Sequence, residues 1–355
     1  MRVLFLSMLL AVLIPVAAFA QTGAAKTDAK AAEVLKQARK ALGGEDKLKA
    51  LQSLTANGSR RFSMGQNTAE GEFEVDMILP DKILTSSGFS SPMGEITSIQ
   101  ALNGDKVWND TIRPVGMGGP GGGGGGGRMV FMGGPGGGNN PQDREAGEAR
   151  QKAELVRLTL GLLLVSPSSF PLEYTYAGEA TAPDGKADVI DAKGPNNFEA
   201  RLFFDQKSHQ LLMLTYKGKD FRQMMRGGPG GGQGGGQGRE GRGQGGGQGR
   251  PPGMLSREEL EKLPPEERAK KEAEMKEMRD KRAAEMRERM AKLPDVEFQW
   301  NFSDYKSVNG INLPHRLTKA TAGETNEEWE IKKYKINPQI KPDKFEKKEK
   351  EKNQS

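Results

Sequence analysis

Cysteine is absent from the 355-residue sequence, and histidine occurs only twice. Without cysteine the chain can form no disulfide, thiolate metal site or thiol nucleophile, and it lacks the residue that accepts lipid in a bacterial lipoprotein. His209 and His315 have no serine or carboxylate at a recognisable catalytic spacing, and the motifs of serine hydrolases, zinc proteases and P-loop enzymes are missing. We therefore expect a protein that is not an enzyme and that holds no metal or cofactor.

Hydrophobic residues are also scarce, at 35%, against ~45–50% in ordinary globular chains. Two glycine-rich segments, residues 113–142 and 226–254, explain much of this shortage. Glycine loses more backbone entropy on ordering than any other residue and buries no side chain. We interpret both segments as disordered, flexible linkers inserted into a domain.

Neither sign of charge is in large excess. The 53 Lys and Arg residues are interleaved with 47 Asp and Glu residues, so the net charge of +6 implies no strong field. The Arg/Gly stretch 226–250 is similar to RNA-binding segments, but it contains no aromatic residue on which a base could stack. We interpret this stretch as a spacer and expect no nucleic-acid partner.

The first twenty residues contain one positive charge at Arg2, an unbroken apolar run and a small-x-small ending at Ala18, Phe19 and Ala20. This is the pattern of a secretory signal peptide, here cleaved before Gln21. An uncleaved anchor is the alternative, but the apolar run is short for a membrane span and a polar stretch follows it. We expect an exported, periplasmic protein that is peripheral to the membrane rather than integral.

One α+β domain emerges when the glycine-rich segments are set aside. Helical spacing of apolar residues predicts a helix that stops at Gly43–Gly44 and a second that is strongly apolar over 160–165. Alternation of apolar and polar residues predicts roughly ten antiparallel strands, each with one buried face. We expect a large curved sheet wrapped around helices. The domain would comprise residues 21–112, 143–225 and 294–340, followed by a disordered tail over 341–355.

A long charged helix is predicted within the insertion 255–293. Its few apolar residues fall on one narrow face, at Met275, Met278, Met286, Met290 and Leu293. Such a helix can stand nearly alone in water, or it can lay its methionines on an apolar surface of an envelope protein. Thioethers also bind Cu(I), but helical spacing spreads these sulfurs over several turns, whereas one ion needs three or four together.

Five short motifs of the domain resemble the outer-membrane lipoprotein carrier family, with its LolA/LolB-like fold. They are "ALGGEDKLKALQSLTANGS", "FEVDMILPDKILTS", "ALNGDKVW", "ARLFFDQKSHQLLML" and "FSDYKSVNGINLPHRL". The resemblance implies a half-open antiparallel β-barrel, helices that form a lid, and an apolar cavity that binds acyl chains of a lipid. In the lipoprotein carrier an arginine precedes the proline of the second motif and helps to close the lid, whereas here Leu79 precedes Pro80.

Strand residues whose alternation places them inward are the candidates for such a cavity: Phe73, Val75, Met77, Trp108, Leu202, Phe204, Val296, Phe298, Trp300 and Phe302. The candidate lid residues are Leu158, Leu160, Leu162, Leu163 and Leu164. The same pattern fits an ordinary packed core. Two functions stay open: a carrier or sensor of a lipid or other apolar ligand, and an envelope interaction module with a filled barrel whose inserted helix engages a protein partner.

Overall fold

The computed structural model describes residues 27–64, 67–91, 94–112, 141–182, 185–220, 259–260 and 262–347. The predicted signal peptide and the Arg/Gly spacer lie outside these residues, as do nearly all positions of the two predicted glycine-rich linkers. The predictions for them stay predictions.

A single antiparallel sheet dominates the described part of the chain. Its strands are β1 (Ser53–Met64), β2 (Asn67–Ile78), β3 (Lys82–Ser91), β4 (Gly94–Asn103), β5 (Lys106–Ile112), β6 (Glu173–Ala182), β7 (Gly185–Gly194), β8 (Phe198–Asp205), β9 (Leu211–Lys219), β10 (Asp295–Val308), β11 (Ile311–Thr321) and β12 (Glu324–Ile336). Their order is β5-β4-β3-β2-β1-β12-β11-β10-β9-β8-β7-β6. The roughly ten predicted strands become twelve partly because a turn at Gly104 divides one predicted strand into β4 and β5.

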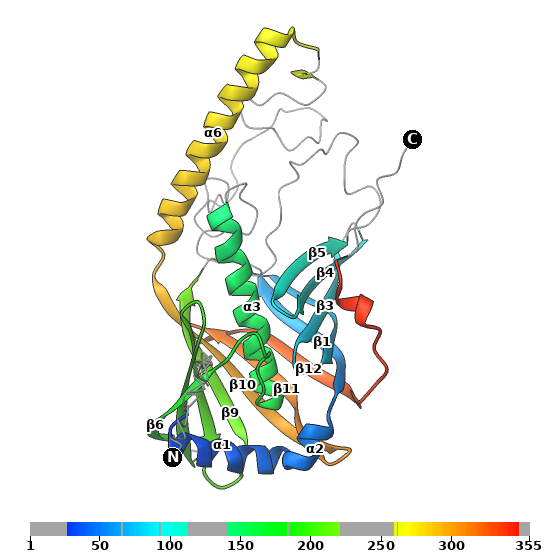
Figure 1. Ribbon diagram of the computed structural model, residues 1–355, viewed down its shortest axis with the longest axis vertical. Helices are drawn as coiled ribbons and strands as arrows, with labels where there is room; N and C mark the ends of the chain where they lie inside the picture. The colour runs from blue at the N-terminus through cyan, green and yellow to red at the C-terminus, as the bar shows by residue number, and fades with distance from the viewer. Residues whose placement is uncertain are drawn as a thin grey trace, which may run out of the picture.

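The sheet curves without closing. Strands β5 and β6 form its two edges and do not pair with each other, while β1 and β12 join its two halves in the middle. Figure 1 shows α3 lying across the curved sheet and α1 running along one end of it. The expected fold class, a half-open antiparallel barrel with a helical lid, is therefore confirmed.

The helices in the described part of the chain include α1 (Ala29–Leu42), α2 (Glu45–Ala50), α3 (Pro141–Leu163), α6 (Pro265–Ala291) and the 3-10 helix η1 (Pro342–Phe345). Asp28 caps α1 by accepting a hydrogen bond from the Ala31 amide at 2.7 Å. Gly43 ends α1 with φ of 149°, where a Cβ would come within 2.8 Å of the Gly310 carbonyl oxygen, so the predicted helix stop is required sterically.

Helix α3 begins at Pro141, whereas the sequence predicted a disordered linker through residue 142. Proline fits the first turn of a helix because the amide it lacks would have no partner there. No residue of α3 before Gln151 is buried, but its second half lies in the main core. The helix therefore has an exposed N-terminal half and a buried C-terminal half.

Helix α6 has no buried residue along its length, in agreement with the predicted charged insertion. It extends beyond the end of the sheet in Figure 1. Among the described residues, an ion pair between Arg287 Nε and Asp143 Oδ2 at 3.0 Å connects it to α3. Just after the helix, the Leu293 carbonyl accepts a hydrogen bond from Lys219 Nζ at 2.7 Å.

The start of the predicted disordered tail is ordered against the outer face of the sheet. Phe345 of η1 is completely buried beside Leu84 and Ala101, and its carbonyl accepts a hydrogen bond from Trp108 Nε1 at 2.7 Å. Lys344 forms ion pairs with Glu74 and Asp76. The sequence prediction failed here because one buried aromatic ring, within a run of lysine and glutamate, leaves no periodic signal.

Replacing Phe345 by alanine should release this C-terminal segment. We expect residues 341–347 to detach locally at a cost of about 1 to 2 kcal/mol, since the segment can open without unfolding the sheet. Faster exchange of the Lys344 amide, which donates to the Lys341 carbonyl at 3.1 Å, and of the Trp108 indole N–H would report the release. The matched variant Glu346→Ala, at an exposed neighbouring position, should leave exchange unchanged. Equal protection in both variants would contradict the anchoring role of Phe345.

Candidate ligand-binding face and its polar band

Helix α3 spans the concave face of the sheet between its two halves. Gln151 Nε2 donates to the Trp108 carbonyl of β5 at 2.6 Å, and Arg157 Nη2 donates to the Glu199 carbonyl of β8 at 3.2 Å. Between these two hydrogen bonds along the helix, Glu154 forms an ion pair with Lys319 of β11. One helix thus connects the edge strand β5 with strands of the other half across the opening.

The five predicted lid leucines all lie buried at the C-terminal end of α3 or directly after it. Leu158, Leu160, Leu162, Leu163 and Leu164 belong to the main core, with exposed fractions of 9% or less. Gly161 lets the helix approach β10 closely, because a Cβ at this position would come within 2.3 Å of Phe302 Cζ. This segment therefore fills the concave face rather than lying loosely over it.

Most of the ten predicted cavity residues meet at this face. Seven are buried in the main core with α3: Phe73, Val75, Met77, Leu202, Phe204, Trp300 and Phe302. Phe298 is half-buried and stacks on Tyr216 with the ring centroids 5.1 Å apart. Val296, also half-buried, pairs with Gly218 further along the same strands.

The prediction for Trp108 was wrong. Val107, not Trp108, packs against the main core, so the tryptophan lies on the outer face of the sheet with Phe345. The short strand β5 carries apolar residues at both of these neighbouring positions, so alternation could not decide which one faces inward.

The apolar interior is tightly packed. A cavity of about 10 Å³ lies between α1, α3 and the end of β9, where Ala38, Leu162 and Tyr305 are among the lining residues. This space holds about one water molecule. This space is too small for an acyl chain.

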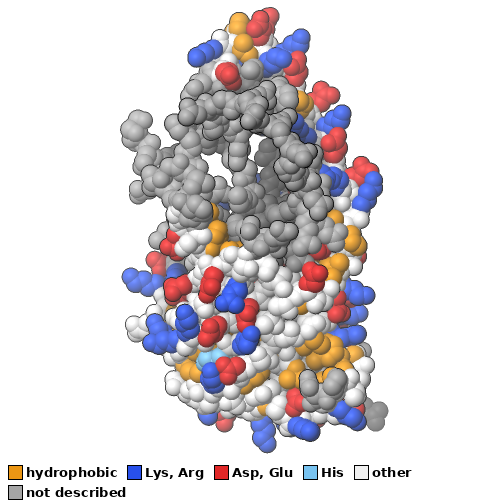
Figure 2. Space-filling view, turned by 180° about the vertical axis from the view of Figure 1, so that it is seen from behind, with side chains coloured by type: hydrophobic (Ala, Val, Ile, Leu, Met, Phe, Trp, Pro, Cys, Tyr) orange, Lys and Arg blue, Asp and Glu red, His pale blue; other side chains and the backbone are white. Residues whose placement is uncertain are grey.

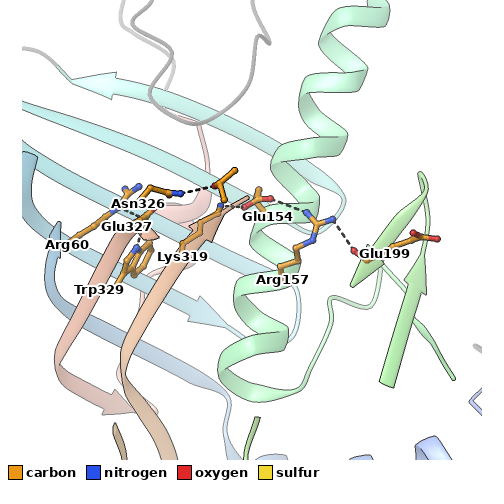
Figure 3. A network of polar contacts seen from close by, with 9 residues as sticks. Arg60, Glu154, Arg157, Glu199, Lys319, Asn326, Glu327 and Trp329 are labelled. Atoms are coloured by element: carbon orange, nitrogen blue, oxygen red, sulfur yellow. Dashed lines mark hydrogen bonds and ion pairs between the residues drawn. The ribbon is translucent and has the colours of Figure 1, made fainter. Parts of the chain in front are cut away.

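The buried apolar strand residues of the concave face are here called the apolar floor. Charged and polar residues form a second layer beyond it, here called the polar band: Arg60, Glu154, Arg157, Lys319, Asn326 and Glu327. Figure 3 shows them reaching across the gap between α3 and strands β1, β11 and β12. Lys319 Nζ donates to Glu154 Oε2 at 2.9 Å, and Arg157 Nη1 donates to Glu154 Oε1 at 3.1 Å. A single carboxylate thus holds two cations.

Electrostatics in the polar band favour the charged forms. Burial alone would raise the pKa of Glu154, but Lys319 and Arg157 outweigh it and lower this pKa to about 2. Burial would lower the pKa of Lys319, but Glu154 reverses this and holds it above its usual value. Both partners are therefore ionised at neutral pH.

A second ion pair adjoins the first. Arg60 Nε lies 2.6 Å from Glu327 Oε1, and Trp329 donates its indole N–H to the same carboxylate. Asn326 donates to Thr321 Oγ1 at 2.8 Å. Glu327 therefore binds Arg60 and Trp329 on the β1 side of the band.

Aromatic rings lie against the cations. The Arg157 guanidinium lies 3.6 Å from the centroid of the Tyr216 ring, and Lys319 Nζ lies 5.0 Å from that of Trp300. Such contacts favour a cation that has lost part of its water. The band therefore presents positive charge between flat apolar surfaces.

Reasoning from the sequence missed the polar band, although a signal was present. Lys319 continues an inward-facing series of β11 after Leu313 and Leu317, and Glu154 and Arg157 interrupt an apolar helix. A charge at an inward position is uncommon unless it is paired. Alternation alone could not name partners that lie 165 residues apart, as Glu154 and Lys319 do.

Arg39 was missed as well. It donates from Nη1 to the Leu164 carbonyl at 3.0 Å and pairs with Glu45, so it ties α1 to the end of α3. Leu79, which stands where the lipoprotein carrier has an arginine, packs instead against the main core. In this chain the helix end is therefore held by an arginine from α1.

Other candidates for chemistry are not assembled into a site. His315 lines a polar surface hollow of about 300 Å³, where Arg316 pairs with Glu328 and Arg61 Nε lies 3.8 Å from Glu70 Oε2. Figure 2 shows charged side chains of both signs gathered on this side of the molecule. His209 lies in the turn between β8 and β9. Within the described ranges, no three His, Asp or Glu residues cluster as metal ligands.

The methionines of α6 do not converge on one point. Met275 and Met290 are fifteen residues apart on one helix, which separates them by ~22 Å at 1.5 Å per residue. Met286 is 45% exposed. This spacing does not form a Cu(I) site within α6.

None of the helices in the described part of the chain is long and apolar enough to span a membrane. No protein-family model matches the sequence, and no curated protein matches it.

Three solved structures are similar to the chain at low identity. One is described as an outer membrane lipoprotein-sorting protein domain from Vibrio parahaemolyticus, with 9% identity and a TM-score of 0.40 over 89% of this chain and 96% of that one. A LolA superfamily protein from Nitrosomonas europaea has 7% identity and a TM-score of 0.39 over 89% of this chain and 97% of that one. A DUF1329 family protein from Desulfovibrio piger has 7% identity and a TM-score of 0.36 over 89% of this chain and 97% of that one. The LolA superfamily is the one that the sequence motifs resemble, but likeness at this level establishes neither a shared activity nor a shared ligand.

Proposed function

We propose that the protein is a non-enzymatic binding protein of the cell envelope that carries or senses a lipid or another apolar, acyl-bearing ligand on its concave face. The observation that supports this most is that helices cover the apolar floor of an open sheet, with α3 lying across it and α1 packed into the same core, while β5 and β6 remain unpaired with each other. The buried stretch Leu155–Leu164 then takes the place that acyl chains would occupy.

The proposed mechanism is an exchange of apolar surfaces. An entering chain gains ~0.8 kcal/mol per buried methylene, which offsets the contacts that the leucines of α3 lose. The exposed N-terminal half of α3 gives the helix room to move, while Arg39 holds its C-terminal end at Leu164. Leu164 has a φ of 55°, outside the helical region, so the chain already changes direction there. We expect α3 to swing about this point.

The test is mass spectrometry of organic extracts of the mature protein, purified from its own periplasm beside an exported control protein of similar size. We expect an acyl-bearing species at about one equivalent per chain, because the interior offers one apolar floor. Extracts that match the control, together with no binding of an apolar fluorescent probe, would contradict the proposal.

The tight interior supports a second candidate, an envelope interaction module. A cavity of about 10 Å³ suits a permanently filled scaffold, and α6 stands exposed with its methionine face available to a protein partner. This alternative predicts that deletion of residues 226–293 abolishes capture of an envelope partner and preserves the fold. Under the first proposal, the same deletion leaves ligand binding nearly unchanged.

A further inference from the structure

The polar band contains more positive than negative charge. Three cations, Arg60, Arg157 and Lys319, accompany two carboxylates, Glu154 and Glu327. Glu327 is paired with Arg60 and bonded to the Trp329 indole. In the described chain, Glu154 is thus the carboxylate in ion-pair contact with both Lys319 and Arg157. Two cations share one counter-ion beside the apolar floor.

Two donors beside these cations have no acceptor. The Nε–H of Arg157 and the indole N–H of Trp300 are buried and find no hydrogen-bond partner among the described residues. Both residues are more than nine-tenths buried. Buried donors are nearly always satisfied, so each of these two N–H groups offers a hydrogen bond to an acceptor of a bound ligand.

Glu154 is the member of the cluster nearest to solvent. Its side chain is 33% exposed, against 9% for Lys319 and 10% for Arg157. The carboxylate therefore lies at the rim, with the cations beneath it. Because Glu154 and Arg157 both belong to α3, a movement of this helix would carry this pair away together and leave Lys319 of β11 without its counter-ion.

We propose that the polar band is a subsite for an anionic headgroup, and that this group replaces Glu154 as the counter-ion of Lys319 when α3 moves. The inference rests on the proposed function and adds the chemical class of the ligand: an amphiphile whose head carries a phosphate or a carboxylate. The acyl chains lie on the apolar floor, the anion lies in the polar band, and the exchange of counter-ions couples headgroup recognition to the opening of α3.

The experiment measures binding of dodecyl phosphate, dodecyl maltoside and inorganic phosphate to the full mature chain by titration calorimetry. We expect dodecyl phosphate to bind about tenfold more tightly than dodecyl maltoside, since charge-assisted hydrogen bonds are about twice as strong as neutral ones. Glu154→Gln should strengthen dodecyl phosphate binding further, because the competing carboxylate is gone. Lys319→Met should abolish the preference.

Matched controls keep charge changes away from the polar band. Glu148→Gln alters an exposed carboxylate on the same helix, and Lys306→Met removes an exposed lysine from β10. Neither should change the preference. If Lys319→Met fails to fold, Lys319→Arg should retain the preference, and the charge-balanced double variant Glu154→Gln/Lys319→Met should lose it.

The outcomes separate the two proposals. Equal binding of the phosphate and maltoside amphiphiles overturns the headgroup subsite but leaves an apolar binding protein. If neither amphiphile binds, the proposed function fails, and the titration with inorganic phosphate then tests the anion site alone. Phosphate binding that Lys319→Met removes supports an anion site without a lipid. Absence of phosphate binding overturns the site. Inorganic phosphate as tight as dodecyl phosphate would identify the free anion as the ligand.

Discussion

Replacing Phe302 by alanine should lower the free energy of unfolding by about 3 to 5 kcal/mol, the usual cost of truncating a buried aromatic residue. Phe302 is 3% exposed and packs directly beneath Gly161 of α3. The loss removes both the ring and the support for the helix over the concave face. Equilibrium unfolding in urea measures the change.

The contact between Gly161 and Phe302 can be tested by whether Gly161→Ala lowers or raises the free energy of unfolding in two backgrounds. Alanine is favoured over glycine within a helix by about 1 kcal/mol, yet Gly161→Ala should destabilise by about 1 to 2 kcal/mol because its Cβ overlaps the Phe302 ring. In the Phe302→Ala background the same change should become stabilising. Gly147→Ala, in the part of α3 outside the core, isolates helix propensity and should stabilise in both backgrounds. A Gly161→Ala effect of the same sign in both backgrounds would show that α3 does not press on β10.

Fixing α3 to the sheet should abolish ligand binding. The chain has no cysteine, so a pair introduced at Asn109 and Gln151, whose side chains are 3.2 Å apart, can be joined selectively by a short bis-methanethiosulfonate reagent. We expect binding of an apolar fluorescent probe to fall at least about tenfold in the linked protein, because the floor becomes accessible only when α3 moves. Reduction of the link should restore binding.

The control for this experiment joins cysteines introduced at Arg144 and Glu148, one turn apart on the exposed half of α3. This link leaves the helix free of the sheet, so binding should persist. Probe binding that survives the link between α3 and β5 would contradict the role of α3 as a lid. It would place the probe elsewhere on the molecule.

Local patterns were enough to predict most elements of the fold. Apolar spacing and the Gly43–Gly44 stop predicted α1, and the alternation of Phe73, Val75 and Met77 predicted β2 with its buried face. These features depend on residues two to four positions apart, and such spacings are visible in any single chain. The leucines of α3 were likewise recognisable as a buried segment before their surroundings were known.

Sequence periodicity therefore predicted which residues avoid water. Which side chains meet depends on the tertiary structure. The pairing of β1 with β12 joins Leu54 to Ile336, and this fold of the sheet brings Lys319 to Glu154 and Phe345 to Trp108. Periodicity carries no information about contacts between residues so distant in the chain, because they depend on the curvature and register of the whole sheet. The polar band, the packed interior and the anchored C-terminal segment all arise from such contacts.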